Sequence, residues 1–345
     1  MRLTVRALGV LPDLAAGDDL VDLLLAAWPD GPLDGDVLVV SSKAVAKVEG
    51  RTLRADRDDV VAAETDREVA RRGDLRVART RHGLVLAAAG VDESNTAAGT
   101  VVALPLDPDA SARGLRSELA TRTGRNVAVV VTDTAGRPWR TGQTDIAIGV
   151  AGLEPLRDLA GEPDAWGRPL VVTAPAVADE LAGSAGLVLA KAARTPGAVV
   201  SGLARLVLPP GEHGPGAAAL VRPEAADLFG LGSADAVAAA VRRGTGDRRG
   251  FAIPPAPAVL GDLAASAAMG HPQVSAQTGV NEHGPVVLIR AAPSRAPTEA
   301  AVLLAAGAVA ERLRTLGWVA GLQLVAVPAP VDAVCAVADQ SGSVH

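Results

Sequence analysis

The chain has a single cysteine, no tyrosine and few aromatic residues of any kind. Cys335 is the one cysteine among 345 residues, and aromatic residues make up 2% of the total. One cysteine excludes an intrachain disulfide and a cysteine-based zinc site within one chain. The five histidines, at positions 82, 213, 271, 283 and 345, form no HxH or HxxxH pair. A bound metal would therefore take oxygen ligands, which favours Mg²⁺ or Mn²⁺.

Long apolar runs and an excess of basic charge are also absent. No apolar stretch reaches the roughly 20 residues that span a membrane, and the N-terminus lacks the apolar segment of a signal peptide. We therefore expect a cytoplasmic protein. The formal net charge of −6 argues against a nucleic-acid partner, because such proteins usually carry a basic face.

The commonest nucleotide and hydrolase motifs are missing as well. There is no GxxxxGK[ST] loop, no GxGxxG after an apolar strand and no GxSxG turn. A phosphate-binding site in this chain has to use another arrangement of residues.

The chain does contain enough apolar residues, 49% of the total, for two domains. A stretch rich in proline and glycine, 208–223, separates them. We predict a first domain at 1–210, a linker at 211–224 and a second region at 225–345. In the second region the pattern predicts helices at 234–243, 258–268 and 298–318, with a strand at 286–289.

Three short apolar runs in the first domain are each followed by polar residues. The runs are 37–40, 84–88 and 127–131, and the polar residues after them are Ser42 and Lys43, Asp92 and Asn95, and Asp133 and Thr134. Unbroken apolar runs are typical of strands buried on both faces. In open sheets, ligands gather where such strands end. The pattern therefore predicts a site for a nucleotide phosphate and its metal ion.

The other predicted elements of the first domain follow from apolar patterns and capping residues. They are a strand at 3–10, a helix from Leu20 capped by Asp18 or Asp19, a helix at 112–123 capped by Asp109 and closed by Gly124, a turn at 135–138, a strand at 170–172, a helix at 178–193 and a strand at 199–203.

Each candidate ligand also has a purely structural interpretation. Asp92 and Asp133 are either metal ligands or carboxylates that cap turns. Lys43 and Lys47 either contact phosphate or form a solvated face of a short helix, since they are four residues apart.

A cluster of basic and aromatic residues follows the third apolar run. Arg137 and Arg140 can grip a carboxylate or a phosphate in a bidentate manner. Alternatively, they form salt bridges to Asp145 or Asp158. Trp139 either stacks on a ring or packs within its loop.

Five segments, taken together, resemble the coenzyme F420-0:L-glutamate ligase family. They are SSKAVAKVEGR (41–51), HGLVLAAAGVDESN (82–95), PLDPDASARGLRSEL (105–119), VVTDTAGRPWRTGQTDIAIG (130–149) and VADELAGSAGLVLAKA (177–192). The resemblance covers roughly residues 1–205 without interruption.

The resemblance implies an α+β fold with mixed sheets that forms an intertwined homodimer. It implies an enzyme that uses GTP and Mg²⁺ or Mn²⁺, with K⁺ as a further candidate, to join L-glutamate to F420-0 through an acyl phosphate. Further glutamates are then added through γ-links.

The resemblance also assigns residues, though no general base. The GTP-binding residues it implies are Leu11, Pro12, Asp13, Leu14, Ser42, Lys43, Lys47, Asn95 and Lys191, and the metal ligands are Asp92, Asp133 and Thr134. The chain departs from the family at Lys191, where many members carry a polar residue that contacts metal or nucleotide. A charged lysine cannot bind metal, so Lys191 is expected to serve the phosphates. Ser201 stands where the family often has arginine.

The second region is similar in places to the flavin-binding, nitroreductase-like domain that is fused to this ligase in actinobacterial relatives. It is about half the length of that fold, and its RRGTGDRRGF segment (242–251) lacks most of the usual flavin phosphate motif. We expect a shortened α/β nitroreductase-like region that binds no FMN. The alternative function is a flavin-dependent reductase of dehydro-F420-0.

Overall fold

The computed structural model describes residues 2–94, 96–189, 195–242, 259–272, 274–281, 284–291, 299–319, 324–327 and 333–338. The chain divides into two compact units, Met1–Arg222 and Pro223–His345. The division falls inside the predicted linker, but residues 211–222 belong to the first unit. They are held there because the carboxylate of Asp109 accepts hydrogen bonds from the backbone N–H groups of Ala217 and Ala218, at 2.7 and 3.2 Å.

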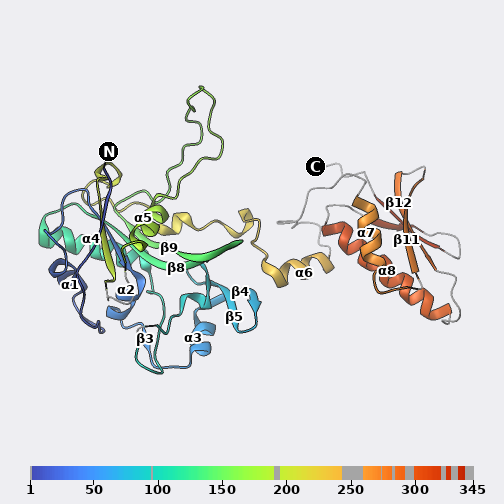
Figure 1. The fold of residues 1–345 in the computed structure, drawn as a ribbon, viewed down its shortest axis with the longest axis horizontal. Coiled ribbons are helices and arrows are strands. Elements are labelled where there is room, and N and C mark those ends of the chain that lie inside the picture. Colours follow the sequence, from blue (N-terminus) through green and yellow to red (C-terminus); the bar gives the residue numbers. More distant parts are fainter. Residues whose placement is uncertain are drawn as a thin grey trace. The chain divides into compact units, whose positions relative to one another are not determined.

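A five-stranded sheet forms the centre of the first unit (Figure 1). Its strands, in spatial order, are β1 (Thr4–Ala7), β10 (Gly197–Ser201), β2 (Val37–Ser41), β8 (Ala128–Arg137) and β9 (Arg140–Ala151). Strands β2 and β8 are parallel, and the other neighbouring strands are antiparallel. The mixed sheet and its helices confirm the α+β class.

Helices cover both faces of this sheet. One face packs against α1 (Leu20–Ala26), α2 (Ser42–Val48) and α4 (Pro108–Thr123), and the other packs against α5 (Val177–Gly186). Successive residues of β2 therefore enter different cores: Leu38 and Val40 enter the first, and Val37 and Val39 the second. Burial on both sides explains why this strand is apolar from Val37 to Val40.

The predicted apolar strand at 84–88 is not part of the central sheet. Strand β6 (Val85–Ala87) pairs with β5 (Leu75–Thr80), which pairs with β4 (Thr65–Arg72) in a separate three-stranded sheet. Helix α3 (Arg57–Glu64) and the short pair β3 (Thr52–Leu53) and β7 (Val101–Val102) complete this part of the unit. An apolar run indicates burial, but it does not indicate which sheet buries it.

The predicted strand at 170–172 is wrong. These residues lie in an arm, 154–176, that protrudes from the first unit as the green-yellow loop in Figure 1. Its one bridge within the described residues joins Pro163 to Pro169. Val171 and Val172 are 79% and 88% exposed, so no neighbouring strand covers them.

The N-cap of helix α4 lies two residues earlier than predicted, and the helix itself begins at Pro108 and not at residue 112. Asp107 is its N-cap and accepts a hydrogen bond from the N–H of Ala110 at 2.8 Å, with Pro108 as the first helical residue. Asp109, the predicted cap, binds backbone N–H groups of other segments instead. Gly124 ends the helix in a left-handed conformation, as predicted.

Other predicted boundaries differ from the structure by several residues. Asp19 caps α1, as one of the two predicted candidates. The predicted turn at 135–138 is displaced, because β8 continues through Arg137 and pairs with β9, and the turn lies at 138–139. The strand predicted at 3–10 is formed only over β1, and the helix predicted at 178–193 is formed as α5.

In its described residues, the second unit combines three helices with an antiparallel sheet. The helices are α6 (Gly232–Arg242), α7 (Val259–Ala268) and α8 (Glu299–Val319), and the sheet has the order β11 (Val274–Asn281), β12 (Gly284–Ala291), β14 (Ala333–Ala338) and β13 (Leu324–Val327). All three helices and one strand were predicted; β11, β13 and β14 were not.

The second unit corrects the α/β expectation for this region. All three strand pairs in its sheet are antiparallel, and α7 and α8 pack on Val274, Val287 and Ile289 of β11 and β12. This arrangement is α+β. Most of the eroded flavin motif, 243–251, lies outside the described residues.

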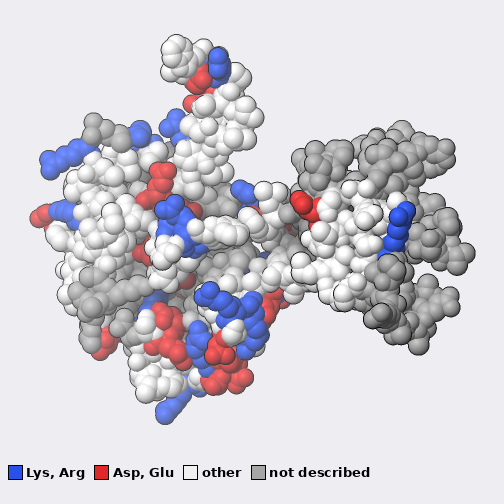
Figure 2. All heavy atoms as spheres, turned by 45° about the vertical axis from the view of Figure 1, so that its right-hand side comes forward, with Lys and Arg blue, Asp and Glu red and all other residues white. Residues whose placement is uncertain are grey.

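Acidic and basic side chains intermingle on the first unit. Over strands β4 and β5, Arg71 pairs with Glu68 and Arg79 pairs with Asp66, and Figure 2 shows the two signs side by side there. This surface carries no broad basic face. Within the described residues, no helix is both long and apolar enough to cross a membrane.

Candidate active site

A cavity of about 950 Å³ opens in the first unit beside the end of β2 and the middle of β8. Nine of the sequence-predicted residues line it: Leu11, Pro12, Asp13, Leu14, Lys43, Lys47, Asp92, Asp133 and Thr134. Its volume is in the range of sites for cofactor-sized ligands. The structure therefore brings these residues to one place.

The parallel pairing of β2 and β8 brings Lys43 and Lys47, which follow β2, close to Asp133 and Thr134 of β8. Ser41 at the end of β2 lies opposite Thr132 of β8, so both strands deliver their following residues to the same edge. Helix α2 starts at once, with Ser41 as its N-cap. Lys43 and Lys47 are one turn apart on this helix, and both line the cavity.

Ser42 lies behind the cavity wall. It is 4% exposed, and its hydroxyl group donates a hydrogen bond to Oδ1 of Asp133 at 3.1 Å. Its side chain therefore positions a predicted metal ligand.

Asp92 reaches the cavity from the segment that follows β6. After β6 the chain turns sharply through Ala88 and Ala89, whose φ angles are 50° and 51°, and Asp92 then forms an antiparallel bridge with Val102. Left-handed φ values are uncommon for alanine. A tight turn, with no strand end at the sheet edge, thus places this carboxylate.

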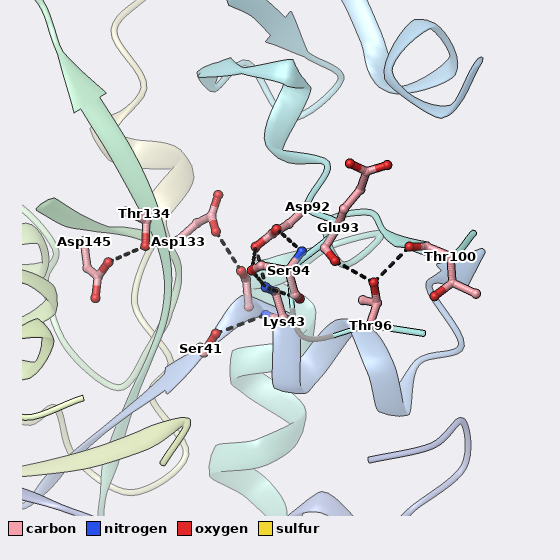
Figure 3. A network of polar contacts seen from close by, with 11 residues as sticks. Ser41, Lys43, Asp92, Glu93, Ser94, Thr96, Thr100, Asp133, Thr134 and Asp145 are labelled. Carbon is pink, nitrogen blue, oxygen red and sulfur yellow. Dashed lines mark hydrogen bonds and ion pairs between the residues drawn. The ribbon is translucent and has the colours of Figure 1, made fainter. Parts of the chain in front are cut away.

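Asp92 takes part in a dense polar network with Lys43 and Ser94 (Figure 3). The Nζ of Lys43 binds Oδ2 of Asp92 and the hydroxyl of Ser94, the latter at 2.8 Å. The N–H of Ser94 donates to Oδ1 of Asp92 at 2.6 Å. Burial by itself raises the pKa of Asp92, but the hydrogen bonds from Lys43 and Ser94 outweigh burial and leave that pKa below its usual value.

Asp133 has the opposite electrostatic character. Burial raises the pKa of Asp133 to about 6, and the negative charges of Asp92 and Asp145 contribute in the same direction. The hydrogen bond from Ser42 opposes the rise only in part. A buried carboxylate beside two others is a favourable position for a cation.

A third carboxylate, Asp145 of β9, lines the cavity next to Asp133. In the β8–β9 hairpin Asp145 is paired with Thr134, whose hydroxyl donates to its Oδ1 at 2.7 Å. The sequence showed Asp145 as a second carboxylate after the strand, but only the register of the hairpin gives it this neighbour.

Many other residues that line the cavity were not predicted from the sequence. The lining residues it did not assign include Thr96, Ala97, Thr100, Gln143, Thr144, Gly183, Gly186, Leu187, Leu189, Thr195 and Pro196. They come from loops, from β9 and from α5, and small or hydroxyl-bearing residues carry no ligand-specific signal by themselves. Two assigned residues, Asn95 and Lys191, lie outside the described residues.

The two arginines near the tip of the β8–β9 hairpin do not form the salt bridges that the sequence suggested. Within the described residues, neither Arg137 nor Arg140 forms a salt bridge with Asp145 or Asp158; Arg137 donates to the carbonyl oxygen of Thr141 at 3.5 Å. Trp139, at the tip, is 95% exposed and has a φ of 60°. The salt-bridge and packing interpretations of this cluster are therefore wrong.

The carboxylates do not form a complete metal cage by themselves. Among the described residues, no three His, Cys, Asp or Glu side chains are arranged to hold a metal ion. Mg²⁺ is commonly bound by one or two carboxylates together with substrate phosphates. Asp92, Asp133 and the Thr134 hydroxyl fit a metal held in that shared manner.

Comparison with known proteins finds a family match within the first unit. Residues 54–202 match the family described as F420-0:Gamma-glutamyl ligase. A protein of Methanothermobacter thermautotrophicus named Coenzyme F420:L-glutamate ligase is 41% identical over 206 residues, covering 53% of this chain and 81% of that protein. Proteins of the same name from Archaeoglobus fulgidus and Methanopyrus kandleri are each 36% identical, over 59% and 62% of this chain and 89% and 92% of their own lengths.

Proposed function

Because the chain belongs to the F420-0:gamma-glutamyl ligase family, we propose that its first unit joins L-glutamate to coenzyme F420-0 through an amide bond and then adds γ-linked glutamates. The observation that supports this proposal is that two lysines and four carboxylates line one cavity. Such a combination suits a ligase, which has to hold phosphate groups, their metal ion and an acid to be activated.

The reaction that we propose uses GTP. The terminal phosphoryl group is transferred to a carboxylate of F420-0, and GDP leaves. The amine of glutamate attacks the resulting acyl phosphate, phosphate leaves, and the nitrogen releases its proton. The residues proposed for the nucleotide are Leu11, Pro12, Asp13, Leu14, Ser42, Lys43, Lys47, Asn95 and Lys191.

Asp92, Asp133 and Thr134 are the proposed ligands of Mg²⁺ or Mn²⁺, with K⁺ as a further candidate ion. A bound divalent ion would neutralise charge on the phosphates during transfer. Lys43 would hold Asp92 in position through their hydrogen bond and bring positive charge to the same wall. Ser42 would fix the orientation of Asp133.

A homodimer in the cytoplasm is part of the proposal. The arm at 154–176 exposes Trp166, Val171 and Val172, which are 79% to 88% accessible. Exposed apolar side chains gathered on a protruding segment favour contact with another protein surface. A second copy of the chain is the partner that the family resemblance supplies.

The proposal is tested by incubating the protein with F420-0, GTP, L-glutamate and Mg²⁺ and measuring the products by mass spectrometry. We expect glutamylated F420 and GDP from the wild type. Asp92→Ala should lower the rate at least about a hundredfold, because removing an electrostatic contact to a transition state costs this much in many enzymes.

Asp30→Ala is the matched control for this experiment. Asp30 is also paired with a cation, Arg6, at 3.1 Å, but it does not line the cavity, and its side chain is 84% exposed. The control should retain wild-type turnover. Wild-type turnover by Asp92→Ala would remove Asp92 from the site, and the absence of any wild-type product with GTP would refute the proposed function.

A further inference from the structure

The two ends of the cavity differ in charge. Figure 3 shows Lys43 and Asp92 on one side of Asp133, and Thr134 and Asp145 on the other. The second end is lined by 143–145 of β9 and by Gly183 and Gly186 of α5. Among the described residues that line this end, Asp145 is the only charged side chain.

Helix α5 packs directly on the Asp145 carboxylate. A Cβ atom added at Gly186 would lie 2.9 Å from Oδ2 of Asp145, closer than such contacts occur. At Gly183 an added Cβ would lie 3.4 Å from the hydroxyl oxygen of Thr144. Glycine is disfavoured within helices. Its presence at both positions allows α5 to approach β9 without displacing the lining side chains.

The orientation of the carboxylate is also fixed. Oδ1 of Asp145 accepts the hydroxyl hydrogen of Thr134 at 2.7 Å, and Oδ2 faces Gly186. A carboxylate has about four acceptor positions, so this contact leaves most of its capacity for a ligand. Asp145 is therefore a rigid acceptor at the wall of the cavity.

Besides the metal ion, a ligase of this kind binds the positively charged ammonium group of the incoming amino acid. Lys43 and Lys47 repel such a group from their end of the cavity, whereas a carboxylate without a neighbouring described lysine or arginine attracts it. Building on the proposed function, we propose that Asp145 binds the α-ammonium group of L-glutamate, and that β9 and α5 together form the amino-acid subsite.

The test compares glutamate with glutarate, which has the same two carboxylates but lacks the amine. Asp145→Asn preserves the acceptor for Thr134 and removes the charge. We expect the KM for glutamate to rise about tenfold or more, as for the loss of one charge-assisted hydrogen bond. The inhibition constant of glutarate, the KM for GTP and the affinity for Mn²⁺ in a direct titration should each change less than about twofold.

A second variant alters the surroundings of the Asp145 carboxylate from helix α5. Gly186→Ala places a methyl group against Oδ2 of Asp145, so it should raise the KM for glutamate while leaving that for GTP unchanged. Gly114→Ala is the control, since it also replaces a helical glycine but its added Cβ has no atom within 4 Å. It should leave both constants unchanged.

Three results would overturn the inference. They are an unchanged KM for glutamate in Asp145→Asn, an equal weakening of glutarate and glutamate, and a loss of Mn²⁺ binding, which would make Asp145 part of the metal site. These results require a wild type that consumes GTP and glutamate. Absence of that wild-type activity refutes the proposed function itself, so the two failures are distinguishable.

Discussion

At the scale of single residues, the cavity carboxylates Asp92 and Asp133 differ in their surroundings. Asp92 is bound by Lys43 and by the N–H of Ser94. Asp133 receives the hydroxyl of Ser42 and lies between two other negative charges. An aspartate thus has a lowered pKa at position 92 and a raised pKa at position 133. At Asp133 the hydrogen bonds do not fully offset the cost of burying the ionised carboxylate.

This difference predicts a pH-dependent stability. In the unfolded chain the carboxyl group of Asp133 loses its proton near pH 3.8, whereas in the folded protein it keeps the proton until about pH 6. The folded state therefore loses stability from this group as pH rises through that interval, and the loss is complete above it. Asp133→Asn, measured without metal at pH 8, should raise Tm by a few degrees, since ~1 kcal/mol corresponds to roughly 2–4 °C in a domain of this size.

The same variant separates stability from function. Mg²⁺ should raise the Tm of the wild type at pH 8 and leave that of Asp133→Asn unchanged, while the variant forms no product. Thermal denaturation followed by circular dichroism gives both Tm values. A variant less stable than the wild type at pH 8 would contradict the destabilisation that we assign to the ionised carboxylate of Asp133.

At the scale of elements, helix α4 is joined to the end of the first unit by one buried side chain. Arg116 is 3% exposed and donates hydrogen bonds to the carbonyl groups of four residues: Val127, Leu208, Pro209 and Glu212. An added Cβ at Gly152 would lie 2.3 Å from its Nε, so a glycine is required beside it. This guanidinium explains why the proline-rich stretch is ordered against the sheet.

Arg116→Met should therefore destabilise the first unit by at least ~2 kcal/mol, because it leaves several buried carbonyl groups without donors. Urea unfolding, followed by the fluorescence of the buried Trp28, measures the change. Arg113→Met on the same helix is the control, since Arg113 is exposed and its ion pair with Asp107 is 3.8 Å long. It should change stability by less than about 0.5 kcal/mol, and equal losses in both variants would contradict the role given to Arg116.

At the scale of the whole molecule, the family match and the cavity lie within the first unit. The matched residues are 54–202, and the unit ends at Arg222. The second unit has its own core of α7, α8 and strands β11 and β12. Each unit buries its own apolar residues, which is the physical requirement for independent folding.

A chain that ends at Arg222 should therefore glutamylate F420-0 at a rate within about twofold of the full chain. Light scattering should also find it as a dimer, if the arm at 154–176 forms the contact. A folded but inactive shortened chain would show that the second unit contributes to the reaction. A monomeric one would remove the arm from the proposed interface.

The amino-acid sequence determined the buried strands at 37–40 and 127–131, the polar residues that follow these runs and most of the helices, because apolar runs and capping residues are local signals. Helix α3 was not predicted. The sequence did not determine that 84–88 belongs to a second sheet, nor that Asp145 lies beside Thr134. Those facts depend on strand pairing and hairpin register, which join residues through backbone hydrogen bonds between distant segments. Only the tertiary structure decided that Asp145 and residues of α5 share the cavity of the predicted ligands, because the close approach of α5 to β9 depends on the packing of the whole unit.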